Sequence, residues 1–328
     1  MKRTTHLIAC LMFFGIITSL AQNLEFIDTP EGKHGMKLEN GRVLIPARYD
    51  EYHMFQEDMA AVRLDNKWGF VNVMSGTEVI PPKYDAAGDF TEGLAAIKSN
   101  GKWGFIDKSG KEVVAPRYDE AGDMAEGAAR VILAGKWGFV DRNGKEIVFP
   151  KYQRADNFYD GMATVQLNGK WGVVDLTGKE VVPPKYDDAS RFNDGLMRVL
   201  LNGKQVFIDR AGKEIFTSKY FGTGDFSEGM ARVSENEKFG FIDKTGKEIT
   251  GLSYDFADDF SEGLAAVGVA GKYGFIDKTG KEVIPLQFES LYPMQEGEEK
   301  KYGFYDGKVK VWSQGKAFYI DKTGKEVE

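Results

Sequence analysis

Lys102-Trp103-Gly104-Phe105-Ile106-Asp107 is a six-residue segment that recurs, with few changes, about every 34 residues along the chain. Self-similarity at a fixed period indicates a tandem repeat, in which each unit buries its apolar face only against its neighbours. We therefore predict an array of about nine equivalent units. The copies begin at Lys33, Lys67, Lys102, Lys136, Lys170, Lys204, Lys238, Lys272 and Lys316.

Turn signals on both sides of this segment predict that each unit is built from strands. Asn100-Gly101 lies between two apolar runs, and Asn-Gly favours the type I′ hairpin turn, in which both central residues have positive φ. Pairing across this turn places Ile97 opposite Gly104. Segment 107–110 fits a type I turn that ends on a left-handed glycine. The prediction is an all-β fold of three-stranded antiparallel units joined by loops.

One tyrosine and one further aromatic residue at fixed positions of each unit are expected to form the core between units. Burying one such side chain stabilises the fold by about 1.5–3 kcal/mol. The recurring glycine, Gly104 in the quoted copy, is expected where a neighbouring aromatic ring or the facing isoleucine packs closely. The first series is Tyr49, Tyr84, Tyr118, Tyr152, Tyr186, Tyr220 and Tyr254, with Phe288. The second is Phe55, Phe90, Phe158, Phe192, Phe226, Phe260 and Phe304, with Met124 in place of one aromatic residue.

Such units can form an open solenoid-like stack or close into a β-propeller-like ring. Propeller blades usually have four strands, for which about 34 residues is a short length. The first and last copies are degenerate, as expected for end caps. We favour the open stack and keep the closed ring as the alternative. The atypical first unit is expected at about 22–55, a ten-residue loop insertion near 291–301, and the atypical last unit at about 304–328.

Residues 1–21 have the features of a signal peptide. Lys2 and Arg3 precede an apolar run from Leu7 to Leu20, and Ala21 completes a small-x-small cleavage pattern. Cys10 lies inside the run instead of ending it, so attachment of a lipid there is the less favoured alternative. We expect a protein exported to the periplasm, cell surface or medium, with a repeat domain over 22–328. The mature chain would have no transmembrane span and no cysteine, hence no disulfides.

The charge balance argues against nucleic acid as a partner. The chain has 43 Lys and Arg against 50 Asp and Glu, a formal net charge of −7. Nucleic-acid binding needs a concentrated basic surface, whereas Lys alternates here with Asp and Glu along every repeat.

The copy from Gly101 to Val114, and the one from Gly271 to Pro285, resemble the bacterial WG-containing repeat family. The resemblance covers nearly the whole mature chain and weakens at His34, at Gln205-Val206 and at Ala317-Phe318, where the Trp-Gly pair is lost. It implies a β-rich tandem array, often exported, with an interaction role and no established catalytic residues.

No residue pattern in the chain predicts an enzyme, a metal site or a cofactor. The mature chain has two histidines, His34 and His53, which is too few for a convergent triad or a histidine-rich zinc site. The aspartate that ends seven of the nine copies lacks the alternating oxygen donors of a calcium loop, and it fits the first position of a type I turn better.

The function expected is a non-enzymatic scaffold that binds a protein or another macromolecule of unknown identity over an extended surface. Its variable face would include Arg130, Arg198 and Arg232, in the strand after the Glu-Gly turn. The alternative is a carbohydrate or cell-wall module that binds an envelope glycan with an aromatic ladder. The lysine before each ring could compete for it. The ladder positions are Trp68, Trp103, Trp137, Trp171, Phe239 and Tyr273.

Overall fold

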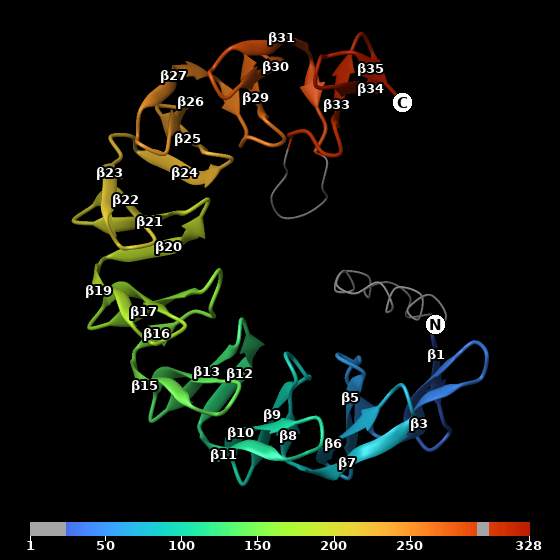
Figure 1. Cartoon of the computed structure of the whole chain (residues 1–328). Coiled ribbons are helices and arrows are strands. Elements are labelled where there is room, and N and C mark those ends of the chain that lie inside the picture. The colour runs from blue at the N-terminus through green and yellow to red at the C-terminus, as the bar shows by residue number, and fades with distance from the viewer. Residues whose placement is uncertain (1–23, 294–301) are drawn as a thin grey trace. The chain divides into compact units, whose positions relative to one another are not determined.

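The computed structural model describes residues 24–293 and 302–328, and these ranges contain strands and no helix (Figure 1). The predicted signal peptide and Cys10 lie outside the described residues, as does most of the predicted insertion at 291–301. The strands form nine small antiparallel sheets, which we number 1 to 9 in chain order. The all-β tandem array is confirmed.

The chain divides into two compact units, and the first comprises residues 1–163 with 176–178. Its described part contains sheets 1 to 4. Their strands are β1 (Leu24–Asp28), β2 (His34–Leu38) and β3 (Val43–Tyr49) in sheet 1; β4 (Glu51–Tyr52), β5 (Met59–Leu64), β6 (Lys67–Asn72) and β7 (Thr77–Tyr84) in sheet 2; β8 (Ala86–Ala87), β9 (Leu94–Ser99), β10 (Lys102–Asp107) and β11 (Glu112–Tyr118) in sheet 3; β12 (Glu120–Ala125), β13 (Ala128–Leu133), β14 (Lys136–Asp141) and β15 (Glu146–Tyr152) in sheet 4.

The second unit comprises residues 164–175 with 179–328 and contains sheets 6 to 9. Sheet 5, of β16 (Arg154–Ala155), β17 (Met162–Leu167), β18 (Lys170–Asp175) and β19 (Glu180–Tyr186), includes the residues at which the units divide. The other strands are β20 (Asp188–Asn193), β21 (Leu196–Leu201), β22 (Lys204–Asp209) and β23 (Glu214–Thr217) in sheet 6; β24 (Gly222–Ser227), β25 (Met230–Glu235), β26 (Lys238–Asp243) and β27 (Glu248–Tyr254) in sheet 7; β28 (Phe256–Ala257), β29 (Leu264–Val269), β30 (Lys272–Asp277) and β31 (Glu282–Phe288) in sheet 8; β32 (Ser290–Leu291), β33 (Lys308–Ser313), β34 (Lys316–Asp321) and β35 (Glu326–Val327) in sheet 9.

Each sheet after the first has a fourth strand that the sequence did not predict. The chain leaves sheet 3 after Tyr118, and β12 then pairs with β13 instead of β11. This strand has two residues in five of the sheets and six residues in β12, β20 and β24, so it lacks a clear alternating pattern. Every sheet consists of consecutive strands, so within the described residues no sheet combines strands from the two ends of the chain.

Both predicted turns and the predicted register are confirmed. Asn100 and Gly101 have φ of 50° and 77°, as a type I′ turn requires. Ile97 pairs with Gly104 across that turn. Gly110 has φ of 83°, and its N–H donates to the carbonyl of Asp107 at 2.9 Å.

The recurring glycine faces backbone, so the expectation that an aromatic ring or the facing isoleucine packs against it is wrong. Trp103 pairs with Tyr118 and Phe105 with Val114, so β11 bulges opposite Gly104. A Cβ atom at residue 104 would lie 2.3 Å from the carbonyl oxygen of Val114. Any side chain at this position is therefore incompatible with the bulge.

The hydrophobic core lies between successive sheets, as predicted. Phe70 and Ile80 of sheet 2 pack in one cluster with Ala95 and Ile106 of sheet 3. An internal sheet such as sheet 3 therefore has one face against the preceding sheet and the other against the following one. The predicted aromatic series occupies these cores: Phe90 and Phe226 are 1% exposed, and Tyr118 is fully buried.

Candidate binding site

The lysine that opens a repeat forms an ion pair with the acid that follows the tyrosine of the same repeat. Nζ of Lys102 lies 2.5 Å from Oδ1 of Asp119. The other oxygen of Asp119 accepts the N–H of Ala134, in the turn between β13 and β14 of sheet 4, at 2.7 Å. These hydrogen bonds, first that of Lys102, lower the pKa of Asp119. The lysine is thus engaged with this acid and not with the adjacent ring. Equivalent pairs are Lys33–Asp50, Lys67–Asp85, Lys170–Asp187 and Lys238–Asp255.

The acid of each Glu-Gly or Asp-Gly turn connects one sheet to the next. Oε2 of Glu92 accepts the N–H of Gly127, in the equivalent turn of sheet 4, at 2.7 Å. It also lies 2.8 Å from a guanidinium nitrogen of Arg142, in the turn between β14 and β15 of sheet 4. We call this contact the turn ion pair. It recurs as Glu57–Lys108, Asp194–Lys244, Glu228–Lys278 and Glu262–Lys322.

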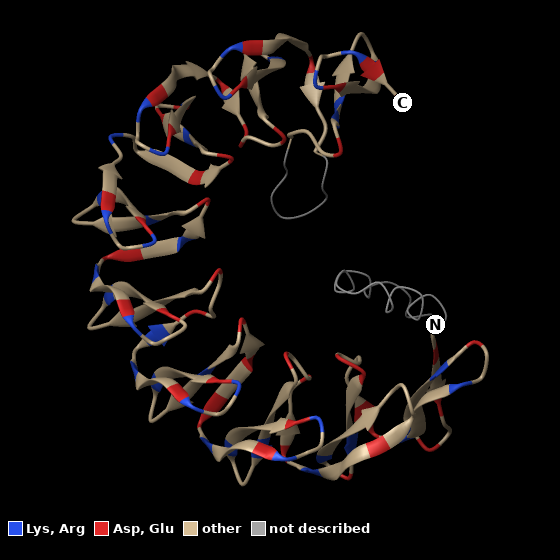
Figure 2. Ribbon diagram, in the orientation of Figure 1, with Lys and Arg blue, Asp and Glu red and all other residues tan. Residues whose placement is uncertain are grey.

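The recurring tyrosines also connect successive sheets. Tyr118 donates a hydrogen bond from its hydroxyl to Glu146 of sheet 4 at 2.8 Å, and the guanidinium of Arg117 lies over the Tyr118 ring. Burial, followed by the hydrogen bond to Glu146, raises the pKa of Tyr118 to about 12, so the hydroxyl stays protonated. Figure 2 shows Lys and Arg alternating with Asp and Glu along the repeats. The recurring charged residues thus connect neighbouring sheets around the apolar cores.

The predicted ladder of aromatic rings is half-buried, and cations from the neighbouring strand cover several of its members. Trp68 packs against the core between sheets 2 and 3. The guanidinium of Arg130 lies 5.0 Å from the ring centroid of Trp137, and that of Arg232 lies 5.7 Å from the centroid of Phe239. Similar contacts join Arg63 to Trp68 and Lys98 to Trp103. The half-buried ladder positions are Trp68, Trp103, Trp137, Trp171, Phe239 and Tyr273.

The three arginines predicted for a variable face are half-buried and bond to the next sheet. Arg130 donates to the carbonyl of Ala155 at 2.9 Å, and Arg232 donates to the carbonyl of Ala257 at 2.6 Å. Arg198 makes the equivalent bond to Thr223. These arginines occur in the sheets whose first strand has six residues. Their removal should therefore cost stability, and their contact with a partner stays a prediction.

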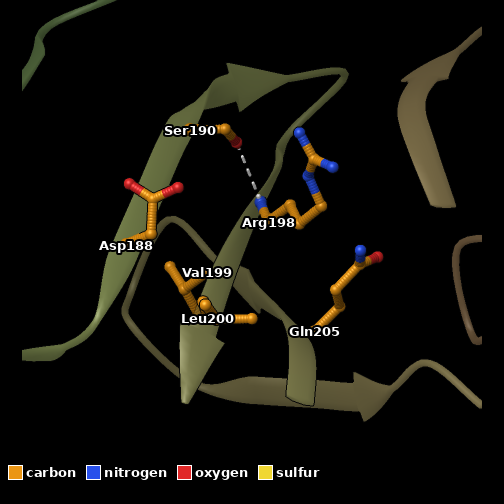
Figure 3. A pocket seen from close by; sticks show the side chains of 6 residues that line it. All are labelled: Asp188, Ser190, Arg198, Val199, Leu200 and Gln205. Carbon is orange, nitrogen blue, oxygen red and sulfur yellow. Dashed lines mark hydrogen bonds between the residues drawn. The ribbon is translucent and has the colours of Figure 1, made fainter. Parts of the chain in front are cut away.

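Two small hollows lie beside these arginines at equivalent places in sheets 4 and 6. The sheet 4 hollow has a volume of about 160 Å³ and is lined by Glu120, Ala121, Gly122, Arg130 and Trp137. The sheet 6 hollow has a volume of about 230 Å³ and is lined by Asp188, Ser190, Arg198, Val199, Leu200 and Gln205 (Figure 3). The structure thus brings the predicted Arg130 and Trp137 together in one place.

Sheet 6 departs from the repeat because Val206 stands at the position of the recurring glycine, as Phe318 does in sheet 9. Val206 pairs directly with Thr217, Phe207 pairs with Phe216, and β23 ends at Thr217. The bulge of β11 is absent here, because its backbone would collide with a side chain at this position. Beyond Thr217 the chain takes a different path, and the side chain of Phe221 is 89% exposed.

Gln205 occupies the ring position of sheet 6, and Phe221 occupies the position of Asp119. Nε2 of Gln205 donates to the carbonyl of Phe221 at 3.2 Å. Sequence reasoning noted Gln205-Val206 only as a degenerate copy and did not select Asp188, Gln205 or Phe221. The loss of ring, glycine and acid within one repeat was the available signal.

His34 and His53 each lie within hydrogen-bonding distance of one carboxylate. Nδ1 of His34 lies 2.7 Å from Asp28, and Nδ1 of His53 lies 2.9 Å from Asp89. Within residues 24–293 and 302–328, no three or more His, Cys, Asp or Glu are grouped to hold a metal ion. In the same part of the chain, we find no helix with the length and apolar character needed to cross a membrane.

The pattern of the family described as WG containing repeat matches eight consecutive segments of the chain. They are 39–68, 68–103, 103–137, 137–171, 171–204, 207–239, 239–273 and 273–297. No curated protein matches this chain in sequence.

Several solved structures match at low identity. A eukaryotic initiation factor is 10% identical over 93% of this chain and 95% of its own, with a TM-score of 0.39. Kluyveromyces lactis Hsv2p is 10% identical over 69% of this chain and 92% of its own, with a TM-score of 0.32. PorZ of Porphyromonas gingivalis is 11% identical over 92% of this chain and 51% of its own, with a TM-score of 0.27.

Proposed function

The chain belongs to the WG containing repeat family, and we propose that it is an exported, non-enzymatic scaffold that binds a protein partner. The observation that carries this proposal is that one set of residues connects the sheets and another set lines the hollows. Those that recur connect one sheet to the next, whereas the two hollows are lined in part by residues that change from repeat to repeat, such as Glu120 and Gln205.

The size of the hollows favours a macromolecule as the partner. Their volumes of about 160 and 230 Å³ lie below the roughly 300–1,000 Å³ of small-molecule sites. A hollow of this size accommodates one side chain of a larger partner. Repeats of one kind present such places along an extended surface, which is how solenoid proteins bind other proteins.

The absence of catalysis is part of the proposal and is supported by how the titratable groups are used. Oδ1 of Asp107 accepts the N–H groups of Ser109 and Lys111, which stabilises a turn. His34 and His53 each pair with one carboxylate, and neither lines one of the two hollows.

A carbohydrate partner is less well supported by the geometry. Sugar binding needs an open ring face, but Arg130 covers Trp137 and Lys98 covers Trp103. Export is supported by the sequence alone, through Lys2, Arg3 and the apolar run that follows them. Cell fractionation and N-terminal sequencing of the mature protein test this part.

The test of the function uses the full mature chain immobilised against a native envelope extract, followed by purification of the captured protein. We expect saturable binding of the purified partner in calorimetry, unchanged after enzymatic removal of its glycans. A parallel glycan array should show no binding. Loss of binding on deglycosylation, a signal on the array, or no saturable partner would each contradict the proposal.

A further inference from the structure

We infer that sheet 6 is the docking site for an extended peptide segment of the partner, and that its hollow takes a neutral carboxamide side chain, Asn or Gln. This inference rests on the proposed function and adds to it a location and a ligand chemistry. It follows from three features of sheet 6: the lining of the hollow, the amide of Gln205 and the exposure of Phe221.

The lining of the hollow includes an acid and a cation that do not face each other directly across the strand pair. In sheet 2 the acid Glu51 pairs with Arg63 at 2.7 Å, directly across the strand pair. In sheet 6 Asp188 has Leu200 at that place, and the cation is Arg198, two residues earlier on β21. Figure 3 shows Asp188 and Arg198 on different sides of the hollow, with Leu200 below them. An acceptor and a donor therefore border the same space.

Gln205 adds a second acceptor. Its Nε2 is used in the bond to Phe221, whereas its Oε1 is buried and has no hydrogen-bond partner. A buried acceptor without a partner is costly, and a ligand N–H that reaches it recovers that cost. The lining thus offers the acceptor Asp188 and the donor Arg198, and the unpartnered oxygen belongs to Gln205 of the same lining.

The charge of the lining selects a neutral ligand that can both donate and accept. A carboxylate would suit Arg198 but would meet Asp188, and an ammonium or guanidinium group would suit Asp188 but meet Arg198. A primary carboxamide has two N–H donors and one carbonyl acceptor, so it can donate to Asp188 and accept from Arg198 at the same time. Its size also fits a hollow of about 230 Å³.

Phe221 supplies an apolar contact next to the hollow. Its carbonyl is held by Gln205 at 3.2 Å, while its side chain is 89% exposed. Aromatic side chains are enriched at the centres of protein interfaces, where they lose contact with water on binding. We therefore expect the peptide to carry an apolar residue beside its Asn or Gln.

The test is a selection from a phage library of random linear peptides on the full mature chain, followed by titration of the enriched peptides. Two variants restore residues found in other repeats and should therefore fold: Gln205→Trp removes the carboxamide and narrows the hollow toward the smaller volume seen beside Trp137, and Phe221→Asp removes the exposed ring. Phe149→Asp is the matched control, because Phe149 is 66% exposed on β15, outside both hollows. Thermal melting confirms folding of each variant.

We expect enriched peptides that contain Asn or Gln beside an apolar residue and bind with little dependence on salt. Gln205→Trp and Phe221→Asp should each weaken binding at least about ten-fold, and Phe149→Asp should leave it unchanged. Enrichment of acidic or basic peptides with a steep salt dependence, or equal binding to Gln205→Trp, would overturn the inference. If the purified natural partner still binds Gln205→Trp fully, docking at sheet 6 fails while the scaffold function stands; if no partner binds the wild type, the function itself fails.

Discussion

Glu25 and Lys37 form an ion pair of 2.8 Å on the face of sheet 1 that has no preceding sheet among the described residues. The equivalent positions of sheet 3 are Ala95 and Ile106, and both are fully buried against sheet 2. Sheet 1 therefore replaces an apolar docking face with a polar, solvated one. Terminal repeats with a polar outer face are what keeps repeat arrays soluble.

Sheet 9 shows the same device on its opposite face. Leu264, Ala266 and Phe275 of sheet 8 are buried against sheet 9. Their equivalents in sheet 9 include Lys308 and Lys310, and Nζ of Lys308 lies 4.9 Å from the ring centroid of Tyr319. Each terminal sheet thus has one face adapted to water.

Replacing Glu25 by Ala and Lys37 by Ile should convert the outer face of sheet 1 into a docking face. We expect self-association of the double variant at micromolar concentrations, because an exposed apolar face promotes association. Light scattering coupled to size exclusion measures it. The control, Glu25→Gln with Lys37→Gln, removes the charges but keeps the face polar, so it should have the same mass in solution as the wild type. A double variant with the wild-type mass would show that this face does not limit association.

Gly104→Ala should lower the free energy of unfolding by about 2–4 kcal/mol, because the added Cβ would lie 2.3 Å from the carbonyl oxygen of Val114. The matched control is Gly122→Ala, where the nearest atom, the carbonyl oxygen of Arg130, would lie 3.9 Å from the Cβ. Gly122→Ala should be neutral or stabilise by up to about 1 kcal/mol, since alanine restricts the unfolded chain. Urea denaturation followed by tryptophan fluorescence compares them. Equal losses would contradict the backbone contact.

Local signals predicted most of the fold. Asn100-Gly101 specified a turn, the turn specified the register that pairs Ile97 with Gly104, and the period specified the stacking. The fourth strand was missed because two-residue strands such as β8 carry no alternation of apolar and polar residues. The reason for the recurring glycine was missed because the bulge opposite it depends on backbone geometry ten residues away.

The candidate site could be predicted only in part. Arg130 and Trp137 were selected for two different hypotheses, and the structure places them in one hollow. The hydrogen bond from Arg130 to Ala155 joins residues 25 positions apart in successive sheets, and no local sequence pattern predicts it. By contrast, the exposure of Phe221 follows from a visible substitution, valine for glycine at residue 206.

Arg232→Ala should lower the free energy of unfolding by about 1–2 kcal/mol, because it removes the charge-assisted hydrogen bond to Ala257 and the contact with Phe239. The control is Lys219→Ala, which removes an ion pair to Glu248 from a side chain that is 71% exposed and should cost less than about 1 kcal/mol. Differential scanning calorimetry ranks the two. Equal melting temperatures for the two variants would show that the arginine does not stabilise the contact with the next sheet.

Leu176→Lys should complete the turn ion pairs. Leu176 is 38% exposed and lies 50 positions after Glu126, the spacing that separates Arg142 from Glu92. Glu126 already accepts the N–H of Gly161 at 2.7 Å, so its carboxylate is in place. We expect a gain of about 0.2–1 kcal/mol that disappears in about 1 M salt. Leu176→Gln, which adds polarity without charge, should not show the salt-sensitive part.

The ion pair between His53 and Asp89 should make the stability of the first unit depend on pH. The hydrogen bond that Nδ1–H of His53 donates to the carboxylate of Asp89 is the main cause of a pKa for His53 above its ordinary value of 6.5, and burial opposes it. A raised pKa means that the folded state binds the proton more tightly, so the contribution is complete below about pH 6.5 and is lost as pH rises through the folded pKa. Both side chains are 37% exposed, so the effect should stay below about 1 kcal/mol.

Asp89→Asn is the matched variant, because it keeps the shape and removes the charge. NMR titration should place the pKa of His53 lower in this variant than in the wild type. The melting temperature of the wild type, relative to the variant, should fall between about pH 6 and pH 8. The ring of His53 lies 4.6 Å from that of Trp68, so tryptophan fluorescence offers a second readout of the same titration. A relative stability that rises over this range would have the wrong sign and would place the proton elsewhere.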